Sequence, residues 1–148
     1  IRNGALESNR VIVPVARTSP GIYSNSQNGI GAGAILKADF SIVRATNPVR
    51  RGDTILIYLT GLGALNTPLS DGAAASSTLL NRVSDTVNVY IGGKRATVSF
   101  AGAAPGFAGL YQINAVVPTD IGAGNAVPIG IETSAAFHDM VDIAITPL

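Results

Sequence analysis

Residues 51–63 read Arg51-Gly-Asp-Thr-Ile-Leu-Ile-Tyr-Leu-Thr-Gly-Leu-Gly63, and this stretch decides the fold class. It consists of a turn signal, a run of apolar and β-branched residues, and a glycine-rich stop. Both faces of the run Thr54–Thr60 are apolar. One face carries Ile55, Ile57 and Leu59, and the other carries Leu56 and Tyr58. A strand with two apolar faces is covered on both sides, so the stretch predicts a buried central strand that ends in a tight backbone feature.

Shorter segments with alternating apolar residues lie on both sides of this strand. The clearest pattern is a hairpin in which Gly92-Gly93, a pair that tolerates positive φ, joins Thr86–Ile91 to Lys94–Phe100. Further predicted strands are Ala34–Lys37, Phe40–Arg44, Leu110–Val117, Val127–Thr133 and Met140–Thr146. The segment Arg10–Ala16 is also a predicted strand. Its Pro14 cannot donate a ladder hydrogen bond, which places this strand at a sheet edge or at its first or last pairing.

These patterns predict an all-β protein of about seven to nine short strands without an amphipathic helix. Turn signals between strands that alternate with period two favour a two-sheet antiparallel β-sandwich, and a closed barrel is the alternative from the same pattern. The expected organisation is an N-terminal tail or linker over residues 1–9, followed by one domain over residues 10–148. A chain of 148 residues is long enough for one real core.

Composition excludes several classes of function. Charged residues make up 13% of the chain, about half of the roughly 25% that is usual. A net charge of +1 gives no electrostatic case for binding nucleic acid or an anionic membrane. The chain has no cysteine, which excludes disulfides, thiolate catalysis and zinc sites built on cysteine. No apolar run approaches the ~20 residues that span a bilayer.

The bias toward Gly, Ala, Thr and Asn, with few Lys and Glu, predicts a secreted or cell-surface bacterial protein. The sequence begins at Ile1 without Met. We therefore expect either a processed product, from which any signal peptide has been removed, or a piece of a longer chain.

Four blocks of the sequence resemble a bacterial family. They are Pro20–Tyr23, the stretch Gly52–Gly63, the hairpin Val89–Val98, and Ala104-Pro-Gly-Phe-Ala-Gly-Leu-Tyr-Gln-Ile-Asn114 with Val117-Pro118. The family is the uncharacterised Solibacter-type C-terminal domain, which is similar to the IPT/TIG group of immunoglobulin-like domains. The resemblance covers the chain from Val13 to Thr146. It implies an immunoglobulin-like module of large secreted or cell-surface bacterial proteins, and it supplies no catalytic residue.

The single histidine, His138, is the first residue to weigh for catalysis. Ser134 and Asp139 lie close to it in sequence, but a catalytic triad is a spatial arrangement without a sequence signature here. We interpret His138 as a solvated residue of a turn, and we expect no catalytic residue.

Glycines and aspartates are the next candidates for binding. Gly29–Gly33 and Gly61–Gly63 lack the third glycine of a phosphate-binding loop and do not open a helix, so we expect no cofactor site. Six aspartates are expected to cap turns: Asp39, Asp53, Asp71, Asp85, Asp120 and Asp139. They are not spaced like the ligands of a calcium loop, so no metal site is expected either.

Three other features have simple structural interpretations. The sequence Arg50-Arg-Gly-Asp53 contains an integrin-type tripeptide, which is read as a turn before the buried strand. Lys37 and Lys94 are expected to be exposed, and a Lys–Asn isopeptide would need a buried lysine beside an acid and an asparagine. The four tyrosines, Tyr23, Tyr58, Tyr90 and Tyr111, are expected to pack on the sheets rather than form a platform for sugars.

Two hypotheses about function remain. The first is a non-enzymatic structural or adhesive extracellular module that binds itself or other extracellular proteins. It could form filaments when Arg10–Ala16 adds as a strand to a neighbour. Deleting residues 1–16 should then abolish oligomers and leave a folded but less stable monomer. The second is a carbohydrate- or calcium-binding accessory domain of an extracellular enzyme, with its site in the loops Ser24–Gly33 and Ala64–Val83, which a ligand-dependent rise in melting temperature would reveal.

Overall fold

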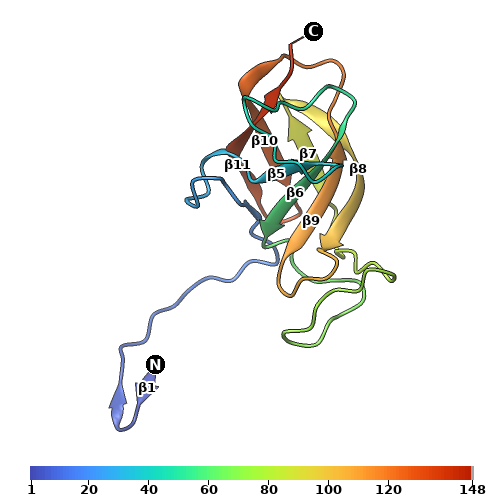
Figure 1. Ribbon diagram of the computed structural model, residues 1–148. Helices are drawn as coiled ribbons and strands as arrows, with labels where there is room; N and C mark the ends of the chain where they lie inside the picture. The colour runs from blue at the N-terminus through green and yellow to red at the C-terminus, as the bar shows by residue number, and fades with distance from the viewer. Residues whose placement is uncertain (148) are drawn as a thin grey trace.

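The computed structural model describes residues 1–147, which form eleven strands and no helix, so the predicted all-β fold is confirmed (Figure 1). No segment of this range is a helix that could cross a membrane. The strands are β1 Arg2–Asn3, β2 Leu6–Glu7, β3 Gly21–Ile22, β4 Gly31–Ala32, β5 Ile35–Lys37, β6 Thr54–Thr60, β7 Asn88–Ile91, β8 Lys94–Ala103, β9 Tyr111–Val116, β10 Gly124–Glu132 and β11 Phe137–Ile145.

The central strand β6 organises the first layer of the fold. It pairs with β9 along one side, while β3 and β5 share its other side. Three of its side chains, Ile55, Ile57 and Leu59, have no exposed surface. The bounds of β6 match the predicted segment because a strand with two apolar faces is stable only where both faces are covered.

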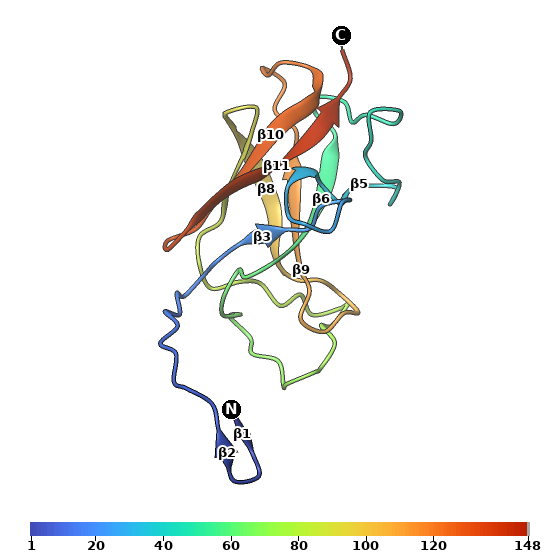
Figure 2. The same cartoon turned by 90° about the vertical axis from the view of Figure 1, so that its left-hand side faces the viewer.

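The second layer consists of β7, β10, β11 and β4, with β4 parallel to β11. The long strand β8 belongs to both layers. Its first residues pair with β7, as in Ala96 opposite Val89, and from Thr97 onward it pairs with β9. The two layers are therefore joined through one strand, and Figures 1 and 2 show them facing each other.

The core lies between these layers and is built from aliphatic side chains. Each fully buried Ile, Leu or Val contributes about 1.5–3 kcal/mol relative to an exposed position. The residues without exposed surface include Ile35, Val49, Leu62, Val89, Ile91, Ile113, Val117, Ile129 and Ile131. Among them, Val89 and Ile91 of β7, Ile113 of β9, and Ile129 and Ile131 of β10 alternate along their strands as the period-two pattern predicts. The hairpin turn at Gly92-Gly93 is confirmed as well, with φ of 57° and 78°.

Several local predictions are wrong. Arg10–Ala16 forms no strand, because no edge within residues 1–147 pairs with it. The tail before it contains the hairpin β1–β2, which Gly4 turns at a φ of 61°. Ser24–Gly33, predicted as loop, contains β4. The predicted strand Phe40–Arg44 keeps only single bridges, such as that between Ile42 and Leu36.

Candidate functional site

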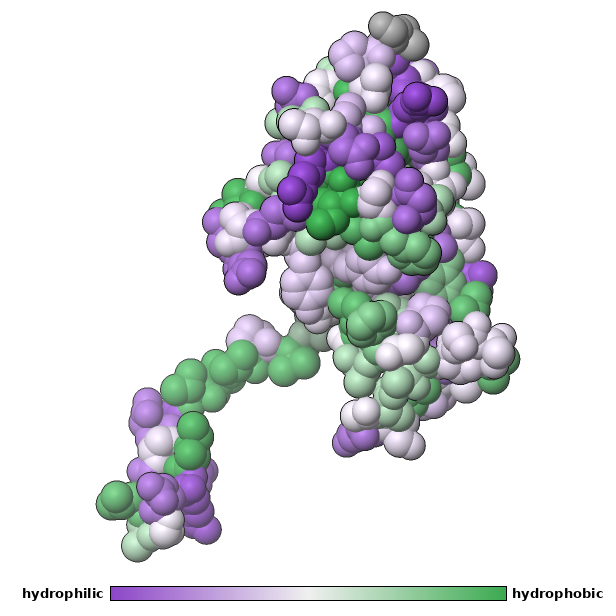
Figure 3. Space-filling model, in the orientation of Figure 1, coloured by the Kyte–Doolittle hydropathy of each residue, from purple (hydrophilic) through white to green (hydrophobic). Residues whose placement is uncertain are grey.

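Residues 1–17 form an arm that extends away from the packed layers (Figure 2). The first buried residue of the chain is Thr18, which is 3% exposed. Six large apolar side chains of the arm are exposed, and four of them lie close together in the sequence: Val11 at 71%, Ile12 at 97%, Val13 at 70% and Val15 at 93%. They form the green stretch along the arm in Figure 3. Contiguous exposed apolar side chains of this kind are typical of surfaces that contact another molecule.

The arm is stabilised only by contacts within itself. Arg2 and Arg10 lie 3.4 Å and 3.7 Å from the carboxylate of Glu7, and both ion pairs are exposed to water. Ion pairs of this kind contribute little. The hydrogen bonds of residues 1–16 join residues of that range to one another. The direction of the arm is therefore set at its root.

The root of the arm is held tightly against β6 and the β10–β11 turn. The hydroxyl oxygens of Thr18 and Thr133 lie 2.7 Å apart, and the Ser19 amide donates to the Gly61 carbonyl at 2.8 Å. Gly61 and Gly63 have φ of 77° and 84°. A side chain at Gly61 would overlap the Ser19 carbonyl group. The glycine-rich stop after the central strand therefore serves as the surface on which the arm is anchored.

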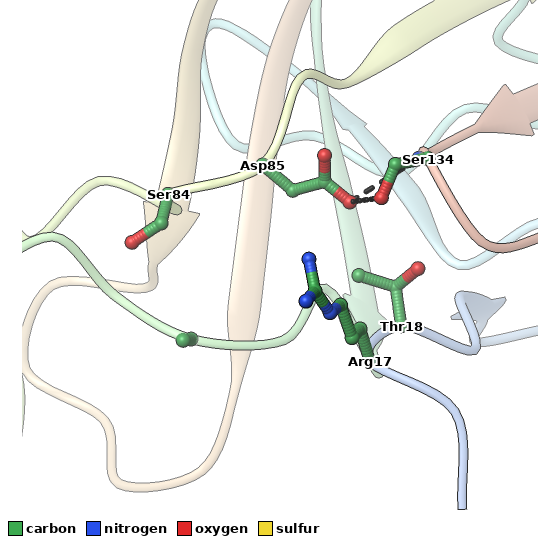
Figure 4. A pocket seen from close by; sticks show the side chains of 6 residues that line it. Arg17, Thr18, Ser84, Asp85 and Ser134 are labelled. Carbon is green, nitrogen blue, oxygen red and sulfur yellow. Dashed lines mark hydrogen bonds between the residues drawn. The ribbon is translucent and has the colours of Figure 1, made fainter.

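A cleft of about 440 Å³ opens beside this root (Figure 4). Asp85 accepts hydrogen bonds from the Ser134 hydroxyl at 2.6 Å and from the Ser134 amide at 3.2 Å. The hydroxyl bond is the main reason that the pKa of Asp85 is lowered, and Arg17 adds a smaller Coulombic effect. Asp85 thereby fastens the β10–β11 turn to the segment that precedes β7.

The chemistry of the cleft is that of a structural clamp. The Ser134 hydroxyl that donates to Asp85 is itself the main cause of the lowered pKa of that carboxyl, which fits a hydrogen-bonded brace between two loops better than a base that takes the proton of Ser134. The lining contains no imidazole and no amine that could take this role, since it consists of Arg17, Thr18, Ala64, Ser84, Asp85 and Ser134.

Replacing Ser134 by Ala should raise the pKa of Asp85 toward its usual value of 3.8, because the strongest hydrogen bond to the carboxylate is lost. A group with a lowered folded-state pKa stabilises the fold above its unfolded-state pKa, and this contribution disappears as the pH falls through the folded-state pKa. The stability difference between Ser134→Ala and the parent should therefore shrink in acid. A carboxyl NMR titration checks the pKa, and an unchanged Asp85 titration would disprove the clamp.

The structure separates the residues considered for a catalytic triad. His138 belongs to strand β11 and not to a turn, and its Nε2 is buried without a hydrogen-bond partner among residues 1–147. The interpretation of His138 as a solvated turn residue is therefore wrong. Ser134 lines the root cleft, whereas Asp139 lines a different cleft with Tyr90 and Phe137. No relay from Ser134 through His138 to an acid is formed.

Residues of the glycine loops and several aspartates form hydrogen bonds within the protein. Within Ser24–Gly33, the Ser24 hydroxyl accepts the amides of Asn28 and Gly29. Asp39 and Asp53 cap turns, as predicted, by accepting the amides of Ser41 and Arg50. Asp139, in contrast, lies in β11. Within residues 1–147, His, Asp and Glu side chains do not gather in a group of three or more that could hold a metal ion.

The two lysines differ from each other. Lys94 is 57% exposed and lies 3.1 Å from the Asp120 carboxylate. Lys37 is only half-buried, not exposed as expected, and its ammonium group donates to the Asn47 side-chain oxygen at 2.6 Å. The nearby Asp39 accepts from the Ser41 hydroxyl, which lowers its pKa and keeps it ionised. Lys37 is not buried as an isopeptide would require, and with Asn47 it forms a hydrogen-bonded brace.

Two of the tyrosines meet in a groove that the sequence did not reveal. Tyr23 follows β3, Tyr58 belongs to β6, and both line a surface groove of about 340 Å³. The remaining lining residues are Asn25, Ala34, Leu36 and Ile42. They come from three separate segments, which only the pairing of β3 and β5 on the same side of β6 brings together. Tyr90 and Tyr111 lie elsewhere, with their hydroxyls bound to Glu132 and the Gly63 carbonyl.

No family model, curated protein or solved structure matches the chain. The resemblance to the Solibacter-type and IPT/TIG domains therefore stays a prediction.

Proposed function

We propose that this chain is a non-enzymatic structural or adhesive module of a secreted or cell-surface bacterial protein, and that it assembles with copies of itself. In this proposal the segment Arg10–Ala16 of one copy binds a neighbouring copy by strand addition. The composition, the all-β fold and the absence of an activated nucleophile in the root cleft support the first part. The exposed arm supports the second.

The observation that carries the proposal is the apolar surface of the arm. The segment is extended, so successive side chains point to opposite faces. Val11, Val13 and Val15 share one face, and Ile12, Pro14 and Ala16 share the other. A strand that is apolar on both faces is suited to burial inside an assembly. In water it exposes surface whose burial stabilises a complex by roughly 25 cal/mol per Å² of area removed from water.

The geometry of the root supports one kind of assembly. Thr18 and Ser19 are hydrogen-bonded to the body, while residues 1–16 extend outward and make no hydrogen bond to it. An extended peptide that adds to a sheet gains main-chain hydrogen bonds and side-chain pockets in the partner. Because donor and acceptor are different surfaces, one copy can bind a second neighbour while a third binds it, and the assembly that we propose is this head-to-tail one, a ring or an open filament.

Negative-stain microscopy and light scattering of the full chain over a dilution series test this function. We expect polymers of graded length that shorten on dilution, because each junction follows mass action. A single monomeric species throughout the series would contradict the proposal. Closed dimers alone would contradict the heterologous contact.

A further inference from the structure

We infer that the groove lined by Tyr23, Asn25, Ala34, Leu36, Ile42 and Tyr58 is the acceptor for the arm of a second copy. The inference rests on the proposed function and adds to it the surface that the arm binds. One chain then carries one donor and one acceptor, which is the stoichiometry that a head-to-tail assembly requires.

The groove matches the arm in polarity. Its lining includes no charged side chain. Other clefts of the surface do include charges: Arg17 and Asp85 at the root, Arg95 on β8, Arg50 and Arg51 near the end of β11, and Asp139 on β11. Placing valine side chains against a charged group removes water from that charge and costs free energy. An apolar groove receives the same side chains without this cost.

The groove lies at an edge of the first layer and remains uncovered. Tyr23 is 46% exposed and Ile42 is 39% exposed. Phe40, which is 68% exposed, directly precedes the segment of Ile42. Strands β3 and β5 share one side of β6, and the segment of Ile42 pairs in turn with β5 as the outermost segment there. Figure 3 shows green surface over β5 on the same face of the molecule that the green arm leaves.

The two tyrosines of the groove have the character of interface residues. The hydroxyls of Tyr23 and Tyr58 have no partner within residues 1–147, whereas those of Tyr90 and Tyr111 are bound. A tyrosine presents a rigid apolar ring and a polar tip, and such side chains are enriched at the centre of interfaces. The rings can pack on the valines of the arm while the free hydroxyls donate to its backbone carbonyls.

The wall of the groove is already fixed before binding. Asn47 donates its amide group to the Ile42 carbonyl at 3.1 Å and accepts from the Lys37 ammonium at 2.6 Å. Val43 and Lys37 form backbone hydrogen bonds across the same turn, to the carbonyls of Ile35 and Ser41. A groove that is held open in the free protein loses little conformational entropy on binding.

Because the chain has no cysteine, disulfide crosslinking can test the contact without background. The test chain carries Val13→Cys together with Ile42→Cys, and a second version carries Val13→Cys with Tyr23→Cys in case the register differs. The control carries Val13→Cys with Leu80→Cys, since Leu80 is 43% exposed and lies outside the groove. Each chain is first assembled under reducing conditions, checked by microscopy, and then oxidised.

The inference predicts a ladder of crosslinked species beyond the dimer for a groove version and at most dimers for the control. Ile42→Lys in the full chain should weaken assembly about tenfold or more, while Leu80→Lys should leave it unchanged, with unfolding midpoints confirming that both variants fold. If filaments form but neither groove version gives a ladder, or if the control gives an equal ladder, the groove is not the acceptor. The proposal of self-assembly would be unaffected by that result. Absence of filaments from the unsubstituted chain would instead overturn the proposed function.

Discussion

Deletion of residues 1–16 will leave a folded monomer that no longer assembles. In the proposed assembly this segment is the donor strand, and it makes no hydrogen bond to the body of the protein. The sequence led us to expect a less stable monomer after this deletion. The structure instead predicts an unchanged free energy of unfolding, because the deleted residues cover none of the core. Light scattering measures the assembly, and chemical denaturation measures the stability.

Point substitutions test whether assembly depends on the apolar side chains of the arm or only on the presence of the segment. Replacing Val11, Val13 and Val15 together by Ser removes about 1.5 kcal/mol or more per buried side chain, so association should weaken on the order of a thousandfold. The control is Leu6→Ser, because Leu6 is 76% exposed and lies in the hairpin before the donor segment. Assembly that survives the triple substitution would show that the arm is not the donor.

Gly61→Ala should produce the largest loss of stability from a single methyl group. Gly61 has a φ of 77°, which an alanine adopts only with strain, and its added Cβ would overlap the Ser19 carbonyl group. The overlap involves backbone on both sides, so no side chain can rotate to relieve it. We expect the free energy of unfolding to fall by about 4 kcal/mol, the range of the most damaging substitutions.

Gly72→Ala is the matched control for this prediction. Gly72 has a similar φ of 74°, but a Cβ added there would meet no atom within 4 Å. Only the conformational strain remains, which costs on the order of 1 kcal/mol. Equal losses in the two variants, measured by denaturant unfolding, would show that the root of the arm is not packed against Gly61.

The central part of the fold could be predicted because its signals are local. The run Thr54–Thr60 is apolar on both faces, and Gly92-Gly93 follows an alternating strand. Both the buried strand and the hairpin turn can be predicted from adjacent residues alone, without knowledge of the rest of the chain. The tail also carries a local signal. The pair Gly4-Ala5 joins β1 to β2, and its glycine supplies the positive φ that a two-residue hairpin turn requires.

The arm illustrates a different limit. The pattern of Arg10–Ala16 correctly indicated an extended apolar segment, and the presence of Pro14 correctly pointed away from a central strand. The expected pairing of Arg10–Ala16 with a sheet edge of the same chain was wrong. An alternating apolar pattern indicates that a segment can form a strand, but it does not identify the strand with which it pairs. Strand patterns specify the surface that must be buried, and the location of the covering surface depends on the tertiary fold.

The groove and the root of the arm could not be read from the sequence at all. Tyr23, Ile42 and Tyr58 are distant in sequence and become neighbours only through the pairing of β3 and β5 with β6. The same holds for Asp85 and Ser134, which meet across two loops. Single tyrosines and aspartates are common in sheets and turns, so their types alone gave no reason to group them.

Amide hydrogen exchange over residues 10–16 tests the central claim most directly. The account predicts rapid exchange in the dilute monomer, where these amides face water, and strong protection in the assembled protein, where they pair with a neighbouring copy. The body of the protein serves as an internal reference, since the exchange of β6 and β9 should be slow in both states. Equal, rapid exchange of residues 10–16 in the monomer and in the assembly would contradict the account.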